Sequence, residues 1–180
     1  MRAVGIEPVH GTRETFRALV DAMSKPGTVQ NAPERADYAV VSTLVDNEIG
    51  FYTEDDELHD VLASQGRLND INFEDANVVH VEGSTGRRVV DANRGTLKEP
   101  SMGATVVYRV GELAEGEGST TVRLEGSGVP GTRLLSLNLP EDEIEAIREA
   151  NSEFPKGVDV VLTTDDKLAA IPRSSEMEVV

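Results

Sequence analysis

The side chains best suited to chemistry in this sequence are three histidines, two runs of carboxylates and four lysines. His10, His59 and His80 are not spaced like metal ligands, either from one another or from a carboxylate motif. A structural role, at the surface or in the packed interior, is the better interpretation for each of them. We therefore expect no metal site at the histidines.

Two acidic runs, EDDE at residues 54–57 and EDE at residues 141–143, could in principle bind a hard cation. Both stand where a helix is predicted to begin, and carboxylates there complement the positive end of the helix dipole. Neither run has the glycine spacing of an EF-hand loop. We interpret both as solvated helix starts.

No nucleophile or cofactor motif is found in its required context. Residues 125–128 (EGSG) come closest to a serine-hydrolase elbow, but they lie between two predicted strands, where the elbow needs a helix to follow. Gly126, Gly128 and Gly131 spell G-x-G-x-x-G, yet a dinucleotide-binding loop must open a helix, and residues 133–139 are predicted to form a strand. The lysines lie in corners, loops or an acidic turn: Lys25, Lys98, Lys156 and Lys167. None has the apolar surroundings of a Schiff-base lysine, so we expect no cofactor and no self-contained catalytic centre.

The first element that could position functional groups is a helix predicted over residues 12–24. Its apolar residues recur at helical spacing, and we expect them to be buried: Phe16, Leu19, Val20 and Met23. Thr12 can cap the helix, and Pro26-Gly27 stops it. Arg17 and Asp21 are four residues apart on the adjoining faces, where they can form an ion pair.

Strand and helix patterns mix along the rest of the chain. Strands are predicted at residues 48–53, 77–81, 104–110, 120–125, 133–139, 158–163 and 168–171, and further helices at 55–68 and 141–150. Residues 37–45 could be a buried strand or a helix. The three strands between 104 and 139 favour an antiparallel meander. Together these patterns predict a single α/β domain over residues 1–180, with a mixed sheet and flanking helices.

Composition narrows the class of protein. The net charge is −16, from 33 acidic and 17 basic residues, which makes nucleic-acid binding through phosphate contacts improbable. The chain has no cysteine and no apolar run near the roughly 20 residues needed to cross a bilayer, so we expect a cytoplasmic protein with no membrane role. Because the acidic residues are evenly spread, we interpret the chain as a protein of a high-salt cytoplasm, where salt screens the repulsion between its charges. The alternative is an ordinary acidic protein.

Several glycine- and proline-marked corners, taken together and in order, resemble the PhnH subunit family of the bacterial carbon–phosphorus (C–P) lyase system. The matching segments are FRALVDAMSKPGT at 16–28, LVDNE at 44–48, GTL at 95–97, GAT at 103–105, LEGSGVPG at 124–131, FPKGVD at 154–159 and IPRSS at 171–175. Two segments depart from the family pattern: PSMG at 100–103 replaces P-E-x-G, and GSG at 126–128 replaces G-P-G. A catalytic carboxylate at position 101 is thereby excluded in this chain.

The resemblance implies a fold related to the pyridoxal-phosphate-dependent transferases but without the cofactor. It also implies a homodimer that assembles with PhnG, PhnI and PhnJ. In that system PhnG, PhnH, PhnI and PhnL are needed for alkylphosphonate to displace adenine from ATP, which gives ribose 1-alkylphosphonate 5-triphosphate. PhnJ later cleaves the C–P bond by radical chemistry. The chain would then be a non-catalytic or co-catalytic subunit of this transferase and lyase complex, with ATP or alkylphosphonate as ligands of a shared site.

Within this framework Arg17, Asp21 and Arg173 are the candidate ligand or partner contacts, because guanidinium groups pair bidentately with phosphate or carboxylate. The alternative is a local Arg17–Asp21 pair and an exposed terminal arginine. The remaining motif residues are interpreted as structural corners: Pro26, Gly27, Gly103, Gly126, Gly128, Gly131, Pro155 and Gly157. Two other functions stay open, a free-standing enzyme acting on a phosphorylated small molecule and a binding module unrelated to phosphonates.

Overall fold

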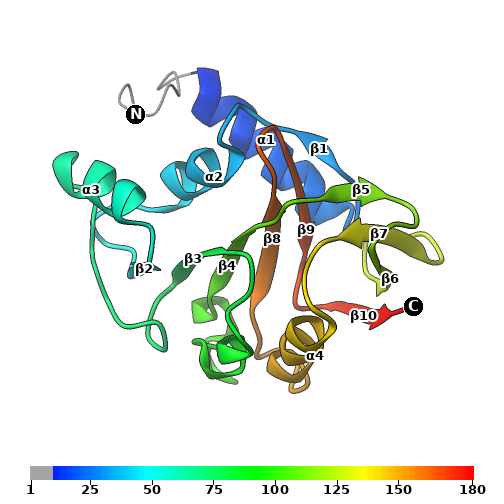
Figure 1. Cartoon of the computed structure of the whole chain (residues 1–180). Helices are drawn as coiled ribbons and strands as arrows, with labels where there is room; N and C mark the ends of the chain where they lie inside the picture. The colour runs from blue at the N-terminus through cyan, green and yellow to red at the C-terminus, as the bar shows by residue number, and fades with distance from the viewer. Residues whose placement is uncertain (1–9) are drawn as a thin grey trace.

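The computed structural model describes residues 10–180, which form four α-helices and two β-sheets (Figure 1). The helices are α1 (His10–Ser24), α2 (Ala36–Leu44), α3 (Asp56–Ser64) and α4 (Glu141–Ala150). The strands of the first sheet are β1 (Gln30–Asn31), β2 (Phe51–Thr53), β3 (Val78–Glu82), β4 (Thr105–Arg109), β8 (Asp159–Thr163) and β9 (Lys167–Ile171). Those of the second sheet are β5 (Leu113–Glu115), β6 (Thr120–Gly126), β7 (Arg133–Leu137) and β10 (Ser175–Val179). Two 3-10 helices, at Arg88–Asp91 and Pro100–Met102, lie between β3 and β4.

The first sheet is mixed and has the order β1-β9-β8-β4-β3-β2. Strands β2, β3, β4 and β8 are parallel, and β9 and β1 close the other side by antiparallel pairing. The carboxyl ends of the four parallel strands therefore lie at one edge of the sheet, which we call the carboxyl edge. The second sheet has the order β10-β6-β7-β5 and is antiparallel throughout.

Alternate residues of the first sheet build two separate cores. Val107 and Val161 face α1, α2 and α3 on one side. Val106 and Val160 point to the opposite side, where α4 and the second sheet cover them. The parallel strands are apolar on both faces because both faces are covered. No helix within residues 10–180 is long and apolar enough to span a bilayer.

The mixed α/β architecture agrees with the sequence-based prediction, but the predicted meander is wrong. Strand β4 joins the parallel sheet between β3 and β8, and of the three strands predicted for the meander only β6 and β7 pair antiparallel with each other. Residues 37–45, undecided from the sequence, are mostly the buried helix α2. Strands β1, β5 and β10 were not predicted.

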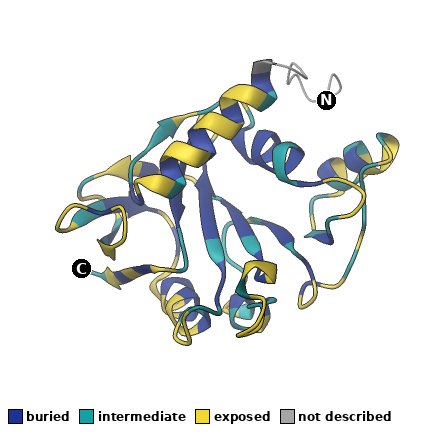
Figure 2. Ribbon diagram, turned by 180° about the vertical axis from the view of Figure 1, so that it is seen from behind, coloured by how far each residue is buried: buried dark blue, intermediate teal, exposed yellow. Residues whose placement is uncertain are grey.

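Helix α1 buries only part of the face that its apolar spacing predicts: Leu19 is buried and Met23 is half-buried against the core, but the other two residues are not. Phe16 and Val20 are 59% and 50% exposed, and they belong to an outward-facing stripe on this helix (Figure 2). The buried side consists of Thr15, Ala18, Leu19 and Ala22. These mostly small side chains let the helix backbone lie close to β9 and α2. The helix also begins at His10, so Thr12 is not its N-cap.

Two of the predicted corners meet in space at the end of α1. Gly27 has φ +78°, and a Cβ atom there would lie 2.6 Å from Cδ1 of Leu124 in β6. Gly128 has φ +81°, and a Cβ atom there would lie 2.5 Å from the carbonyl oxygen of Ser24. A side chain at either position would collide as well as strain the backbone. The two glycines thus allow the β6–β7 turn to pack against the end of the helix.

Candidate functional site

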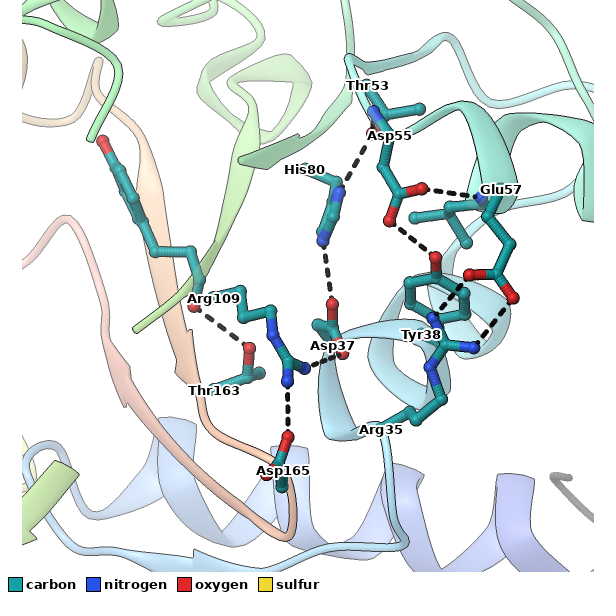
Figure 3. Close-up of polar contacts among 12 residues, drawn as sticks. Arg35, Asp37, Tyr38, Thr53, Asp55, Glu57, His80, Arg109, Thr163 and Asp165 are labelled. Carbon is teal, nitrogen blue, oxygen red and sulfur yellow. Dashed lines mark hydrogen bonds and ion pairs between the residues drawn. The ribbon is translucent and has the colours of Figure 1, made fainter. Parts of the chain in front are cut away.

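The carboxyl edge of the first sheet holds a continuous chain of polar side chains that is buried at its centre, at Asp37 and His80 (Figure 3). Thr53 at the end of β2 places Oγ1 2.9 Å from Nδ1 of His80 in β3. His80 Nε2 lies 3.1 Å from Oδ2 of Asp37, in the first turn of α2. Arg109, the last residue of β4, donates to Asp37 Oδ1 at 3.0 Å and also to Asp165. Four elements and the loop after β8 are joined in this way.

Hydrogen-bond partners engage both nitrogens of His80. An ionised Asp37 only accepts, so Nε2 carries a proton and donates to it, while Nδ1 pairs with the Thr53 hydroxyl. Thr53 Oγ1 in turn accepts from the backbone N–H of Asp55 at 3.1 Å. Only 1% of the His80 side chain is exposed. This imidazole therefore organises the edge and is not free to act as a base on a substrate.

Asp37 is a buried charge that is fully paired. Burial alone would raise the pKa of its carboxyl group, but the hydrogen bond and charge of His80 and the charge of Arg109 outweigh burial and hold the pKa below its ordinary value. A buried charge is tolerated when it is paired and hydrogen-bonded in this manner. The carboxylate therefore stays ionised at neutral pH.

A second set of contacts extends this network to α3. Tyr38 donates its hydroxyl hydrogen to Asp55 Oδ2 at 2.6 Å, and Asp55 caps α3 by accepting from the backbone N–H of Leu58 at 3.1 Å (Figure 3). Arg35 covers the Tyr38 ring at 3.7 Å and pairs with Glu57 at 3.0 Å. Burial, followed by the hydrogen bond to Asp55, raises the pKa of Tyr38 well above its ordinary value. Tyr38 therefore stays neutral and holds the two helices together.

An open cleft of about 290 Å³ lies next to these networks, at the ends of β2 and β3. Its polar lining consists of Glu54, Asp55, His80, Glu82, Ser84, Thr85 and Arg88. The Arg88 guanidinium stands over the rings of Phe73, at 4.3 Å, and Tyr52, at 5.3 Å, and pairs with Glu74 at 2.9 Å. Three carboxylates against one guanidinium make this cleft more suitable for a cationic group than for an anion. Within residues 10–180 no three acidic or histidine side chains are grouped to hold a metal ion.

One wall of the cleft is fixed by Glu143, in the first turn of α4. Its carboxylate accepts from the hydroxyls of Ser84, Thr85 and Tyr108 at 2.8, 2.5 and 2.7 Å, and from the backbone N–H of Arg87 at 2.8 Å. Burial would raise the pKa of Glu143, but these hydrogen bonds, that of Thr85 first, keep the pKa below its ordinary value. The prediction that residues 141–143 are a solvated helix start is wrong for Glu143, which is fully buried.

These two buried carboxylates should make the fold sensitive to acid. Because folding lowers the pKa of both Asp37 and Glu143, their contribution is complete above their ordinary pKa values of about 4 and is lost as the pH falls through the lower values of the folded state. The midpoint of urea unfolding, measured from pH 7 to pH 3, should therefore decrease below about pH 4. An Asp37→Asn/Glu143→Gln variant should be less stable at pH 7 and show a shallower acid dependence. An unchanged acid dependence would contradict this assignment.

Arg173 lies at the opposite edge of the sheet, near the starts of β4 and β8, and makes contacts within the chain. Its Nε and one terminal nitrogen donate to the two carboxylate oxygens of Asp159 at 3.2 and 2.7 Å. The other terminal nitrogen donates to the carbonyl oxygen of Pro100 at 2.6 Å. The terminal nitrogen that binds Asp159 also donates to the carbonyl oxygen of Gly103, at 3.3 Å. With 12% of its side chain exposed, it is not the exposed terminal arginine of the alternative interpretation.

Arg17 and Asp21 lie on the outward face of α1, and both are exposed. In the part of the chain that the structure describes, no ion pair joins them. The prediction of a local ion pair from their spacing is therefore wrong. Neither these residues nor Arg173 lines the cleft at the carboxyl edge. Asp37, which organises that edge together with His80, was not selected from the sequence, whereas the interpretation of His80 as a packed structural residue is confirmed. The available signal was one acidic residue inside an otherwise apolar buried segment, DYAVV at 37–41.

Comparison with known proteins identifies the family. A family model described as bacterial phosphonate metabolism protein (PhnH) matches residues 6–178. The chain belongs to the PhnH family. A relative of this PhnH-family chain, the putative C-P lyase subunit protein HtxG of Stutzerimonas stutzeri, is 29% identical over 170 residues, which cover 91% of this chain and 84% of the relative. The family resemblance of the ordered corner motifs is thereby confirmed.

Proposed function

We propose that this PhnH-family chain is a cytoplasmic subunit of a C–P lyase complex and works mainly through contacts with partner subunits. The name of its relative supports assembly into such a complex. At the carboxyl edge, His80, Asp37 and Glu143 are all engaged in internal hydrogen bonds. Because these side chains are already engaged, we infer that the chain assists other subunits in making ribose 1-alkylphosphonate 5-triphosphate from ATP and alkylphosphonate. The proposed partners are PhnG, PhnI and PhnJ homologues.

The observation that carries this proposal is the outward stripe of α1. Phe16 and Val20 are one turn apart and largely exposed, although large apolar side chains usually face the core. Arg13 and Arg17 flank them on the same exposed side of the helix. Exposed apolar residues beside exposed cations, on a chain with net charge −16, form a surface suited to an acidic protein partner.

The same stripe suits a homodimer. Arg17 and Asp21 are one turn apart and form no ion pair with each other in the described part of the chain. If two copies of α1 cross antiparallel about a two-fold axis, Arg17 of one copy faces Asp21 of the other, with the apolar residues between them. A two-fold interface needs self-complementarity of this kind. Arg17 and Asp21 are therefore proposed as partner contacts.

The positions of the lysines are consistent with a further proposal, that the fold is related to the pyridoxal-phosphate-dependent transferases but that this subunit does not bind their cofactor. Lys25, Lys98 and Lys167 are exposed, and Lys156 pairs with Glu153 at 2.6 Å. A Schiff-base lysine needs an apolar pocket that suppresses its charge, and all four lysines of this chain lie outside such pockets. We propose that ATP or alkylphosphonate, where it reaches this subunit, is held chiefly by cationic residues of partner chains.

Co-purification tests this proposal. The wild-type chain, co-expressed with PhnG, PhnI and PhnJ homologues, should be recovered with them, and Phe16→Asp/Arg17→Glu should reduce recovery by about tenfold or more without lowering the melting temperature. Leu97→Asp, which alters an exposed apolar residue outside α1, is the matched control and should assemble normally. Because we also propose a high-salt cytoplasm for this acidic chain, the assay is done in low and in multimolar KCl.

Two outcomes would reject different parts of the proposal. Normal assembly of the double variant would exclude the α1 stripe as the contact surface. Failure of the wild-type chain to bind any of the three homologues in either salt condition would reject the role in the complex.

A further inference from the structure

The second sheet ends in an open edge at β10. This strand pairs with β6 on one side, and no strand that the structure describes pairs with it on the other. The other sheet borders are shorter: β1 has two residues, β5 has three, and β2, also of three, is bridged by Asp70. Natural proteins keep edge strands short or covered, because an unpaired edge is a template for another strand. An open edge of five residues therefore needs an explanation.

The register of β10 shows which of its backbone groups face the open edge. Val180 donates its backbone N–H to the carbonyl oxygen of Thr121 at 3.0 Å, so these two residues are a hydrogen-bonded pair of the antiparallel ladder. Hydrogen-bonded pairs alternate with pairs whose backbone groups point away from each other. Met177 and Val179 belong to the second kind. Their N–H and C=O groups therefore point away from β6 and have no partner in the ladder.

Open space lies beside this edge. A groove of about 330 Å³ is lined by four consecutive residues of β10, at 175–178, and by Arg148 and Asn151 at the end of α4. Arg123 and Glu125 of β6 complete its lining. Helix α4 and strand β10 are side by side in Figure 1. Four residues of a strand span about 13 Å, so the groove follows β10 far enough to admit an extended segment.

The two faces of the edge differ in charge. Glu176 and Glu178 are exposed on one face, where Glu125 is the direct cross-strand partner of Glu176. Arg123 compensates only Glu178, through an ion pair at 3.1 Å. On the other face Met177 is 7% exposed and packs in the core. A strand added to this edge, whose side chains alternate between the faces, would meet carboxylates on one side and apolar surface on the other.

A second copy of β10 does not suit this edge. The outward-facing residues of two copies would pair with each other, so Glu176 and Glu178, which lie between and beside them, would also pair with each other. Every antiparallel register that overlaps three or more residues then places a glutamate opposite a glutamate. Like charges in that position destabilise a sheet. The edge therefore disfavours its own copy and favours a segment with cationic side chains.

We propose that β10 accepts an extended segment of another protein as a fifth strand of the second sheet, and that lysine or arginine alternates with apolar residues in this segment. The backbone of the segment pairs with Met177 and Val179. Its cations lie beside Glu176 and Glu178, and its apolar residues lie on the side of Met177. In recognition of this kind, main-chain hydrogen bonds provide affinity and alternate side chains provide specificity. The proposal concerns the isolated chain and does not depend on contacts made by α1.

Binding of synthetic peptides to the full chain tests the proposal. A seven-residue peptide of alternating lysine and valine, blocked at both ends, should bind saturably. N-methylation of its valines should weaken binding at least about tenfold, because their N–H groups face β10 when the lysines lie beside the glutamates. N-methylation of the lysines, whose N–H groups face away, is the matched control and should have little effect. No saturable binding, or equal binding of the two N-methylated peptides, would overturn the proposal.

Hydrogen exchange shows where the peptide binds. In the free chain the amides of Met177 and Val179 should exchange faster than those of Glu176 and Glu178, which are bonded to β6. The peptide should slow exchange at Met177 and Val179 by about tenfold or more. Unchanged exchange at these two amides in the bound state would overturn the proposal. Protection that rises with protein concentration in the absence of peptide would assign the edge to a second copy instead.

Variants separate backbone pairing from charge attraction. Val179→Pro removes an N–H of the open edge and should abolish peptide binding while the chain stays folded, whereas Glu178→Pro removes an N–H bonded to β6 and should lower the melting temperature. Glu176→Lys should weaken the lysine peptide by about tenfold. Glu48→Lys, the same charge change in an exposed turn before β2, should leave binding unchanged. Undiminished binding to a folded Val179→Pro variant, or equal effects of the two lysine substitutions, would overturn the proposal.

Discussion

Asp37→Ala is expected to lower the free energy of unfolding by about 3–5 kcal/mol, the range observed when one partner of a buried ion pair is removed. The substitution leaves His80 without its acceptor and removes the buried partner of Arg109. Both Asp37 and His80 have side chains that are 1% exposed, so water cannot replace the lost contacts without opening the edge. Urea unfolding followed by circular dichroism measures the effect.

Asp165→Ala is the matched control, because Asp165 pairs with the same arginine but 80% of its side chain is exposed. Exposed pairs contribute little, so this variant should lose no more than about 1 kcal/mol. Adding His80→Leu to Asp37→Ala should recover part of the stability, since the unpaired imidazole is then replaced by an apolar group. Equal effects of Asp37→Ala and Asp165→Ala would contradict the central place of Asp37 in the network.

The second large effect is expected at Glu143. Glu143→Ala removes the shared acceptor of three hydroxyls and one backbone N–H and should lower the free energy of unfolding by about 3–5 kcal/mol, because unpaired buried donors are costly. Tyr108→Phe removes only one of the four hydrogen bonds and should lose about 1 kcal/mol. Hydrogen exchange should also become faster at the backbone N–H of Arg87, which is bonded to Glu143.

That exchange measurement separates a local from a global effect. If the cleft wall depends on Glu143, the Arg87 amide loses protection by more than the drop in global stability explains. Uniform loss of protection across the sheet would assign Glu143 a role in general packing alone.

The sequence was most informative where local signals and burial agree. Helix α4 spans residues 141–150 as predicted, because Pro140 and the acids of its first turn mark the start, while Ile144 and Ile147 face the core. Strand β8 was predicted to within one residue, because its apolar run is bounded by the corner at residues 154–157 and the acidic turn after residue 163. In both segments neighbours along the chain determine the structure.

Local signals failed where the partner lies far away in the sequence. Strand β4 resembles β6 and β7 in composition, and only its long-range pairing with β3 and β8 places it in the parallel sheet. Asp37 and His80 are 43 residues apart, so spacing could not reveal their contact. Strand β10 does carry an alternating pattern, SEMEV, that favours a strand, and this signal was overlooked.

The prediction for α1 was wrong at Phe16 and Val20 for a related reason. Apolar spacing assumes that large residues fill the core, whereas here Ala18 and Ala22 let the helix lie close to the sheet. Phe16 and Val20 then remain outside. A local pattern measures hydrophobicity, but it does not measure how closely the neighbouring element approaches.

The pairing of β1 has a consequence for how the protein is made. Among the strands that the structure describes, β1 (residues 30–31) pairs with β9 alone (residues 167–171), and α1 also packs on β9. The beginning of the described chain thus depends on a strand that leaves the ribosome more than a hundred residues later. Such long-range contacts slow folding, and segments that await their partners expose apolar surface during synthesis. The first sheet can be completed only after residue 171 has been translated.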